Sequence, residues 1–68
     1  MKHLIIIGAG GMGRTMYDMA RESNGYGIEY DIRGFIDDNI AALDNFANYP
    51  PLIAPIQGYQ PNENEVFI

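Results

Sequence analysis

The sequence predicts an α/β fold: a small parallel sheet that opens with a β-α-β unit. Three observations support this prediction. Residues 3–7 form a continuous apolar, β-branched run, which is typical of a strand buried on both faces. A glycine turn follows at once, and residues 12–22 then change to a helical period. A second strand, more solvated at its start, is expected at residues 28–36.

The expected helix at 12–22 has one apolar face. Apolar residues recur there at i, i+4, i+7 and i+8, namely Met12, Met16, Met19 and Ala20. We therefore expect the three methionines to pack in the core, where methionine fills irregular gaps. Residues 23–25 are expected to end the helix, with Gly25 in the left-handed conformation.

The second half of the chain combines turn residues with short apolar segments. Residues 37–39 (Asp-Asp-Asn) end the second strand, and residues 40–47 permit either a short helix or an irregular path. The segments expected after them are a short strand at 52–54, a loop or at most one helical turn over 55–64, and a buried strand at 65–68. Buried parallel strands need helices on both faces, and only one helix is expected here. The sequence therefore predicts a truncated domain, with residues 1–68 a fragment of a longer chain.

Composition excludes several classes of function. The chain has 68 residues, enough for one small domain, and no cysteine, so it has no disulfide or thiolate metal site. The lone His3 cannot form a metal cluster, and we expect no metal. The net charge is −5 and the four basic residues are dispersed, which disfavours nucleic acid as a partner. No segment approaches the ~20 apolar residues of a membrane span and none resembles a signal peptide, so a cytoplasmic location and no membrane partner are expected.

The motif with the clearest chemistry is the glycine turn. Residues 8–13 (Gly-Ala-Gly-Gly-Met-Gly) fit G-x-G-x-x-G and lie between an apolar strand and an amphipathic helix. Gly8 permits the tight turn, Gly10 lets a diphosphate approach the backbone, and Gly13 lets the helix pack close to the strand. The helix start adds unpaired N–H groups. These features predict nucleotide or phosphate binding; a tight turn without a ligand is the alternative.

Two further positions are candidates for the same site. Asp37 lies 24 residues after Gly13, near the place where an acidic residue binds ribose hydroxyls in this fold. For Asp37 and Asp38 the alternative is a turn whose side chains bond their own backbone. Arg14 lies in the first helical turn, where a cation is unfavourable unless it reaches a phosphate; the alternative is a solvated surface residue. No nucleophile and base can be paired in this chain, so no catalytic residue is expected.

The chain resembles a known family in four places. These are residues 4–14 (LIIIGAGGMGR), residues 34–39 (GFIDDN), Tyr49-Pro50 with Leu52, and the final residues 66–68 (VFI). Together they are similar to the N-terminal domain of sugar O- and N-acyltransferases, the NeuD-like sialic-acid O-acetyltransferases and PglD-like bacillosamine acetyltransferases. The resemblance implies a small Rossmann-like domain that holds a nucleotide sugar of the UDP or CMP type.

The resemblance also implies roles for individual residues. The four glycines Gly8, Gly10, Gly11 and Gly13 would cradle the diphosphate, while Asp37 and Asp38 would face the ribose or base. Met12 stands within this candidate site where the family usually has His, and methionine cannot donate a hydrogen bond. The string at residues 34–39 favours this family over the alternatives, which are the opening β-α-β unit of an NAD-dependent oxidoreductase and a ligand-free interaction module.

The family is expected to have a second part. This part is a left-handed β-helix of hexapeptide repeats that binds acetyl-CoA, forms a homotrimer and supplies the catalytic His. None of it is present in these residues. The parent protein is thus expected to be a sugar acetyltransferase that uses acetyl-CoA, and the fragment is expected to bind substrate without a cofactor and without catalysis.

Overall fold

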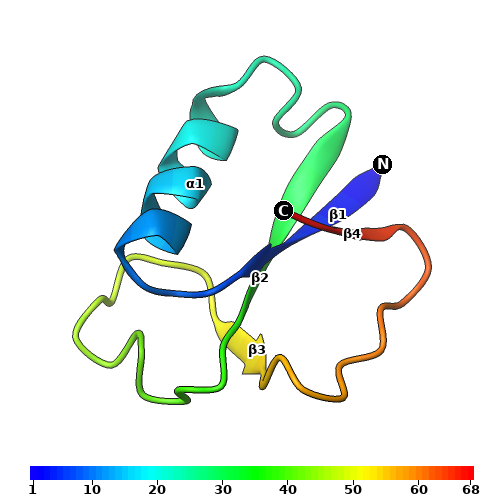
Figure 1. The fold of residues 1–68 in the computed structure, drawn as a ribbon. Coiled ribbons are helices and arrows are strands. Elements are labelled where there is room, and N and C mark those ends of the chain that lie inside the picture. Colours follow the sequence, from blue (N-terminus) through cyan, green and yellow to red (C-terminus); the bar gives the residue numbers. More distant parts are fainter.

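The computed structural model describes residues 1–68 as a four-stranded parallel sheet with one helix packed on it (Figure 1). The elements in chain order are β1 (Lys2–Ile7), α1 (Gly11–Glu22), β2 (Tyr30–Ile36), β3 (Leu52–Ala54) and β4 (Glu65–Phe67). In the sheet the order is β3-β2-β1-β4, and every neighbouring pair is parallel. The α/β prediction, a small Rossmann-like sheet with a β-α-β opening, is confirmed.

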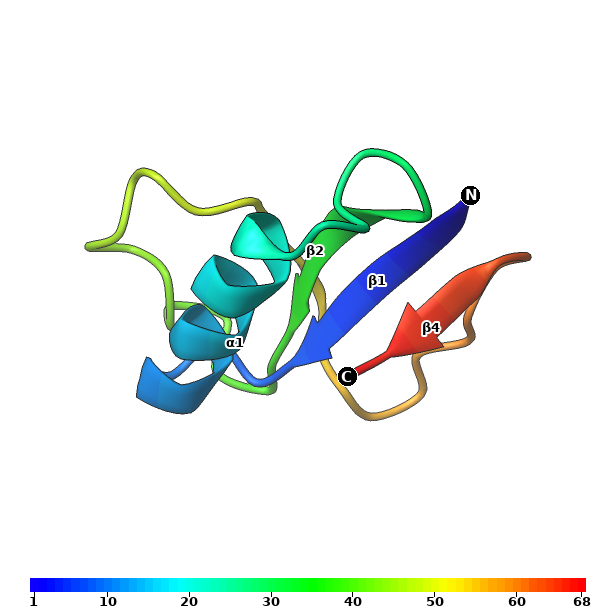
Figure 2. The same cartoon turned by 90° about the horizontal axis from the view of Figure 1, so that it is seen from above.

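The helix packs on the two central strands. It contacts β1 and β2, and β4 lies beyond β1 (Figure 2). The α1 side of the sheet holds a core of Ile6, Ala9 and Phe35, against which Tyr17 and Tyr49 pack. Because side chains alternate along a strand, Ile5 faces the other side of the sheet from Ile6, and it too is fully buried.

The methionine face of α1 is not in the core, which corrects the expectation from its spacing. Met12, Met16 and Met19 are 86%, 40% and 62% exposed. The face toward the sheet carries Gly13 and, one turn later, Tyr17, whose ring lies 6.1 Å from that of Phe35 and 5.4 Å from that of Tyr49. The close approach at Gly13 and the bulky ring at Tyr17 set the rotation of the helix. Met12 and Met19 therefore point to solvent, and Met16 lies at the border of the covered face.

The connection from α1 to β2 also differs from expectation. Gly25 does not take the left-handed conformation; Gly27 does, with φ +81°. The carbonyl of Gly25 instead accepts the N–H groups of Ile28, Glu29 and Tyr30. This compact turn occupies the residues expected to begin the second strand, so β2 starts at Tyr30.

Residues 40–47 take the irregular path rather than the helix. Their backbone bonds join residues three apart, as in the donation from Phe46 N–H to the Leu43 carbonyl. The side chain of Asn39 accepts the Ala41 N–H, a local bond that competes with helix formation. Residues 55–64 form the expected loop, with one turn closed from Tyr59 N–H to the Ile56 carbonyl.

A buried carboxylate at the start of β4, that of Glu65, holds the preceding loop by hydrogen bonds. The Glu65 side chain is only 2% exposed and accepts hydrogen bonds from the Tyr59 hydroxyl and the Asn62 N–H, both at 2.7 Å. The hydrogen bond from the Asn62 N–H, and then that from the Tyr59 hydroxyl, lower the pKa of Glu65. The hydrogen bond to Glu65 raises the pKa of the Tyr59 phenol. These bonds close the loop that leads into β4. The only helix, α1, falls short of the length and hydropathy that a membrane span needs.

Candidate functional site

The glycine turn lies at the carboxyl end of β1, between β1 and the start of α1. Gly8 has φ +89°, a left-handed conformation that favours glycine, and its N–H donates to the Ile36 carbonyl at 2.8 Å. This bond joins the ends of β1 and β2. The turn therefore leaves the sheet at a fixed position.

The turn also lies where the chain changes direction across the sheet. From β1 the chain passes through α1 to β2 and β3 on one side, while β4 lies on the other side of β1. The ends of β1 and β4 are bonded, with Ile7 N–H donating to the Ile68 carbonyl at 3.0 Å. In open α/β sheets, ligands bind beyond the carboxyl ends of the strands at such a reversal of strand order.

The glycines of the turn differ in the space around them. A Cβ added to Gly13 would lie 1.8 Å from the Gly8 carbonyl oxygen, so α1 packs here against the backbone of the turn. A Cβ added to Gly10 or Gly11 would meet no atom within 4 Å. Gly13 thus serves close packing, while the backbone at Gly10 and Gly11 is open to solvent.

The first turn of α1 presents backbone donors without acceptors. Arg14 N–H is the first to be bonded, to the Gly10 carbonyl at 2.9 Å, and the N–H groups of Gly11, Met12 and Gly13 have no partner. The N-cap residue, Gly10, has no side chain to cap them, and the first turn carries no acidic residue. These donors and the helix dipole favour an anion at this position.

Asp37 connects this turn to the end of β2. Its Oδ2 accepts the Ala9 N–H and its Oδ1 accepts the Asn39 N–H, both at 2.8 Å. The bond from Ala9, and then that from Asn39, hold the pKa of Asp37 below its ordinary value. The carboxylate therefore supports the glycine turn and also makes the local turn bond. Two bonds leave part of its acceptor capacity free.

Asp38 points to a different loop. Its Oδ1 accepts the N–H groups of Ile56, at 2.9 Å, and Gln57, at 3.3 Å, in the turn that follows β3. The two carboxylates thus fasten two separate loops at the same edge of the sheet. The side chain of Asp38 is exposed, and its Oδ2 makes no bond.

Arg14 lies against the glycine turn and an aromatic ring. Its Nη1 donates to the Ala9 carbonyl at 3.0 Å, and its guanidinium carbon lies 3.8 Å from the centroid of the Phe46 ring. No carboxylate lies within 4.0 Å of it. The sequence analysis does not identify Phe46 as part of this site, because nothing in an irregular loop indicates that its ring contacts α1.

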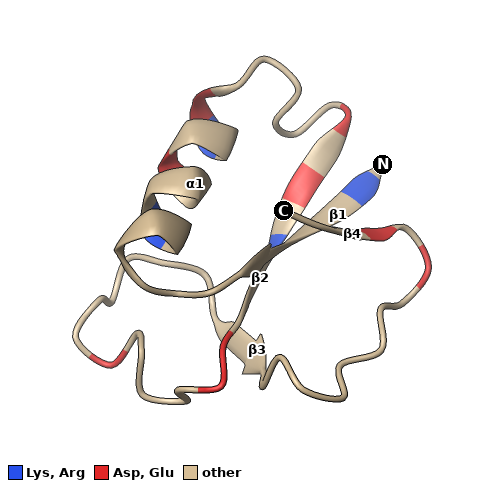
Figure 3. Ribbon diagram, viewed as in Figure 1, with Lys and Arg blue, Asp and Glu red and all other residues tan.

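Other charged groups lie apart from this turn. An open surface hollow is lined by Asp18, Arg21 and Glu22 of α1 and does not include the glycine turn. The basic residues are divided among β1, α1 and β2 and form no patch (Figure 3). His3 pairs with Asp31 at 2.6 Å, at the amino end of the strands. The candidate site is therefore an open surface at the glycine turn.

A family model described as the PglD N-terminal domain matches residues 3–68, nearly the whole chain. Neither the comparison with curated proteins nor that with solved structures gives a match.

Proposed function

The chain belongs to the PglD N-terminal domain family, the N-terminal domain of PglD/NeuD-like sugar acetyltransferases, and from this premise we propose that its glycine turn binds the diphosphate of a nucleotide sugar. One observation carries the proposal. The N–H groups of Gly11, Met12 and Gly13 lack acceptors beside the bare backbone of Gly10, at the carboxyl edge of the sheet. A diphosphate would supply acceptors to these donors and would be stabilised by the helix dipole.

The neighbouring side chains complete the proposed site. Arg14 offers a guanidinium with one Nη1 bond to the turn and further donors for a phosphate. Asp37 and Asp38 retain acceptor capacity for a ribose hydroxyl or for the base. Gly8 and Gly13 shape the turn. Met12, whose side chain is 86% exposed, offers its backbone N–H and an apolar contact only.

Two alternatives remain distinguishable by experiment. The diphosphate of NAD would fit the same donors, so the turn alone does not separate an oxidoreductase from a sugar-nucleotide domain. Family membership favours the sugar nucleotide. We further propose that acyl transfer from acetyl-CoA, and the trimeric assembly, belong to a part of the protein outside these residues.

The decisive test compares ligands by thermal unfolding. UDP or a UDP-sugar is expected to raise the Tm of the protein, by an amount equivalent to about 2.7 kcal/mol at a ligand concentration of 100 Kd. A CMP-sugar, which carries one phosphate instead of a diphosphate, should raise the Tm less than a UDP-sugar, and NAD is expected to have no effect. Equal or greater stabilisation by NAD would refute the sugar-nucleotide assignment. An unchanged Tm with every ligand would favour a purely structural turn.

The site is tested by Gly10→Val. Gly10 has φ −76° and ψ −167°, which valine adopts freely, and its Cβ would meet no protein atom. The variant should therefore fold, with a modest loss of stability because valine is a poorer N-cap than glycine, while its side chain blocks the approach of a diphosphate. Gln60→Val, at an exposed position in the loop before β4, is the control. Unchanged UDP affinity in Gly10→Val would contradict the placement.

A further inference from the structure

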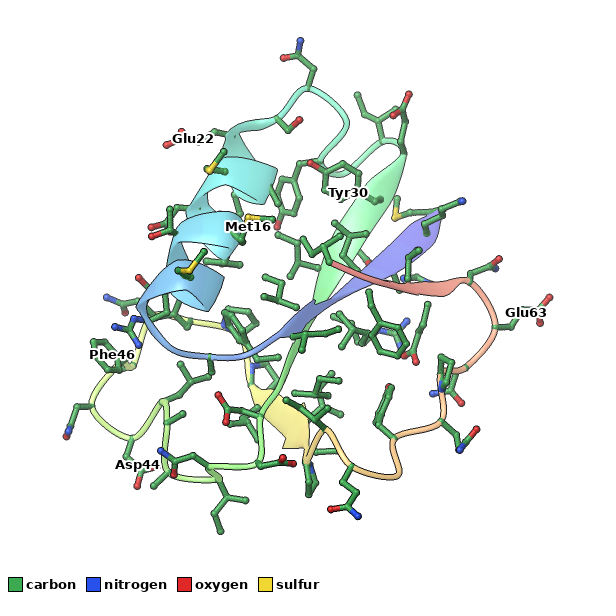
Figure 4. The ribbon with its side chains drawn as sticks, viewed as in Figure 1. Met16, Glu22, Tyr30, Asp44, Phe46 and Glu63 are labelled. Atoms are coloured by element: carbon green, nitrogen blue, oxygen red, sulfur yellow. The ribbon has the colours of Figure 1, made fainter.

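The side chain of Arg14 is stacked on an aromatic ring that belongs to a separate loop. Phe46 projects from the turns after β2 toward the start of α1 (Figure 4). The Arg14 guanidinium lies 3.8 Å above its ring centroid, within cation–π contact. The segment around Phe46 has only turn bonds, so this stack joins an irregular loop to the first turn of the helix.

The charge of Arg14 has no counter-ion. The chain has nine acidic and four basic residues, yet no carboxylate lies within 4.0 Å of this guanidinium. Its place in the first helical turn adds repulsion from the helix dipole. An anion bound at the N–H groups of Gly11 and Met12 would supply the missing counter-ion and would offset the repulsion between Arg14 and the helix dipole.

Phe46 is itself held by the core. Its ring lies 6.2 Å from that of Tyr49, edge to face, and Tyr49 packs in turn at 6.3 Å on the fully buried Phe35. The aromatic row therefore runs from the centre of the sheet to Arg14. Phe46 remains 38% exposed, so its contact with Arg14 lies at the surface beside the turn.

The stack leaves the guanidinium able to bind a ligand. An arginine stacked on a ring keeps its N–H donors in the plane of the guanidinium, away from the ring face. One of them is used by the Ala9 carbonyl, and Ala9 is held from its other side by the Asp37 carboxylate on its N–H. The stack and these two bonds therefore fix where the remaining donors lie relative to the glycine turn.

We propose that Phe46 is a positioning residue for the diphosphate site: it holds the Arg14 guanidinium beside the glycine turn, ready for a phosphate. The inference rests on the proposed function, and it predicts that Phe46 acts on affinity through Arg14 alone. A preorganised arginine loses less conformational entropy when the ligand binds. The ring itself need not touch the ligand.

A double-mutant cycle on the dissociation constant of UDP, measured by titration calorimetry, tests this coupling. Phe46→Leu removes the stack but keeps an apolar side chain against Tyr49, and should weaken binding about three- to fivefold. Arg14→Gln should weaken it about tenfold or more. The double variant should bind no more weakly than Arg14→Gln alone. Phe46→Tyr should retain wild-type affinity, and Ile40→Ala, at a 75% exposed position in the same loop, is the control.

Independent losses would overturn the inference. If the two single effects add in the double variant, or if Phe46→Leu binds UDP like the wild type, Phe46 does not position Arg14. A second readout needs no ligand: the ring current of Phe46 should displace the Arg14 side-chain NMR resonance, and Phe46→Leu should abolish that displacement. No change in that resonance also overturns the inference. Failure of the wild type to bind UDP, with the resonance displaced as expected, refutes the proposed function and leaves the stack confirmed.

Discussion

Gly13 is the position at which a single methyl group should damage the fold. In Gly13→Ala the new Cβ would lie 1.8 Å from the Gly8 carbonyl oxygen and 2.8 Å from its carbonyl carbon. Both are backbone atoms of a turn that is bonded to the end of β2, so they cannot swing aside. The helix must instead move away by roughly 1 Å, since packed interiors leave no spare room.

The magnitude follows from two opposing terms. Alanine in a helix interior gains about 1 kcal/mol over glycine. Overpacking costs typically about 1–3 kcal/mol, and a displaced α1 also loosens the contact of Tyr17 with Phe35 and Tyr49. We expect a net loss of about 2 kcal/mol, against a total stability of roughly 3–10 kcal/mol for a domain of this length.

Urea unfolding followed by far-ultraviolet circular dichroism measures the difference. Gly13→Ala should lower the midpoint at an unchanged m-value, because the same surface is exposed on unfolding. Gly11→Ala is the matched control: it adds the same methyl group to the same helix, where the Cβ meets no atom within 4 Å. This control should be neutral or slightly stabilising. If Gly13→Ala proves as stable as Gly11→Ala, α1 does not pack on the glycine turn as described.

Two further predictions concern Asp37 and the exposed face of α1. The Ala9 and Asn39 N–H groups lower the pKa of Asp37, so its stabilising contribution is complete at neutral pH and is lost as the pH falls below about 4. The free energy of unfolding should therefore fall less on acidification in Asp37→Asn than in the wild type. Identical plots of unfolding free energy against pH for the two proteins would contradict this linkage. Met19→Gln should change the free energy of urea unfolding by less than about 0.5 kcal/mol, whereas Tyr17→Ala should lower it by about 3 kcal/mol. A larger loss for Met19→Gln than for Tyr17→Ala would show that the methionine face is buried.

The strands and the helix could be predicted because their local patterns are strong. Apolar residues, most of them β-branched or aromatic, fill 4–7 and 66–68, and β1 and β4 lie within one residue of the expected ranges 3–7 and 65–68. The expected burial of the last strand is wrong, because β4 lies at the edge of the sheet and Phe67 and Ile68 are each 39% exposed. The rotation of α1 was predicted wrongly. Spacing alone identified an apolar face with three methionines, but the tight contact at Gly13 and the packing of Tyr17 determine which face meets the sheet. Neither contact is visible before the helix is docked.

The candidate site could likewise be predicted only in part. The glycine spacing predicted a tight turn at a helix start, and Gly8, Gly10 and Gly13 have the conformation or the space that their proposed roles require. The partners of Asp37 and Arg14 could not be predicted. Both side chains bond Ala9, and Arg14 stacks on Phe46, which lies 32 residues further along the chain. Contacts of this kind depend on how loops from β1 and β2 meet at the sheet edge.

The strand order has a consequence for the behaviour of the protein at high concentration. The two outermost strands, β3 and β4, are three residues long. An edge strand offers unpaired N–H and C=O groups to which another chain can add a strand, and a short edge strand offers few of them. β3 is also preceded by Pro50 and Pro51, of which neither can donate a backbone hydrogen bond. The most strongly β-forming strand, β1, is enclosed between β2 and β4, whereas β3 covers β2 only at Phe35 and Ile36. The edge left open to another chain is therefore the first part of β2, where Asp31 and Arg33 place charges that oppose intermolecular strand pairing.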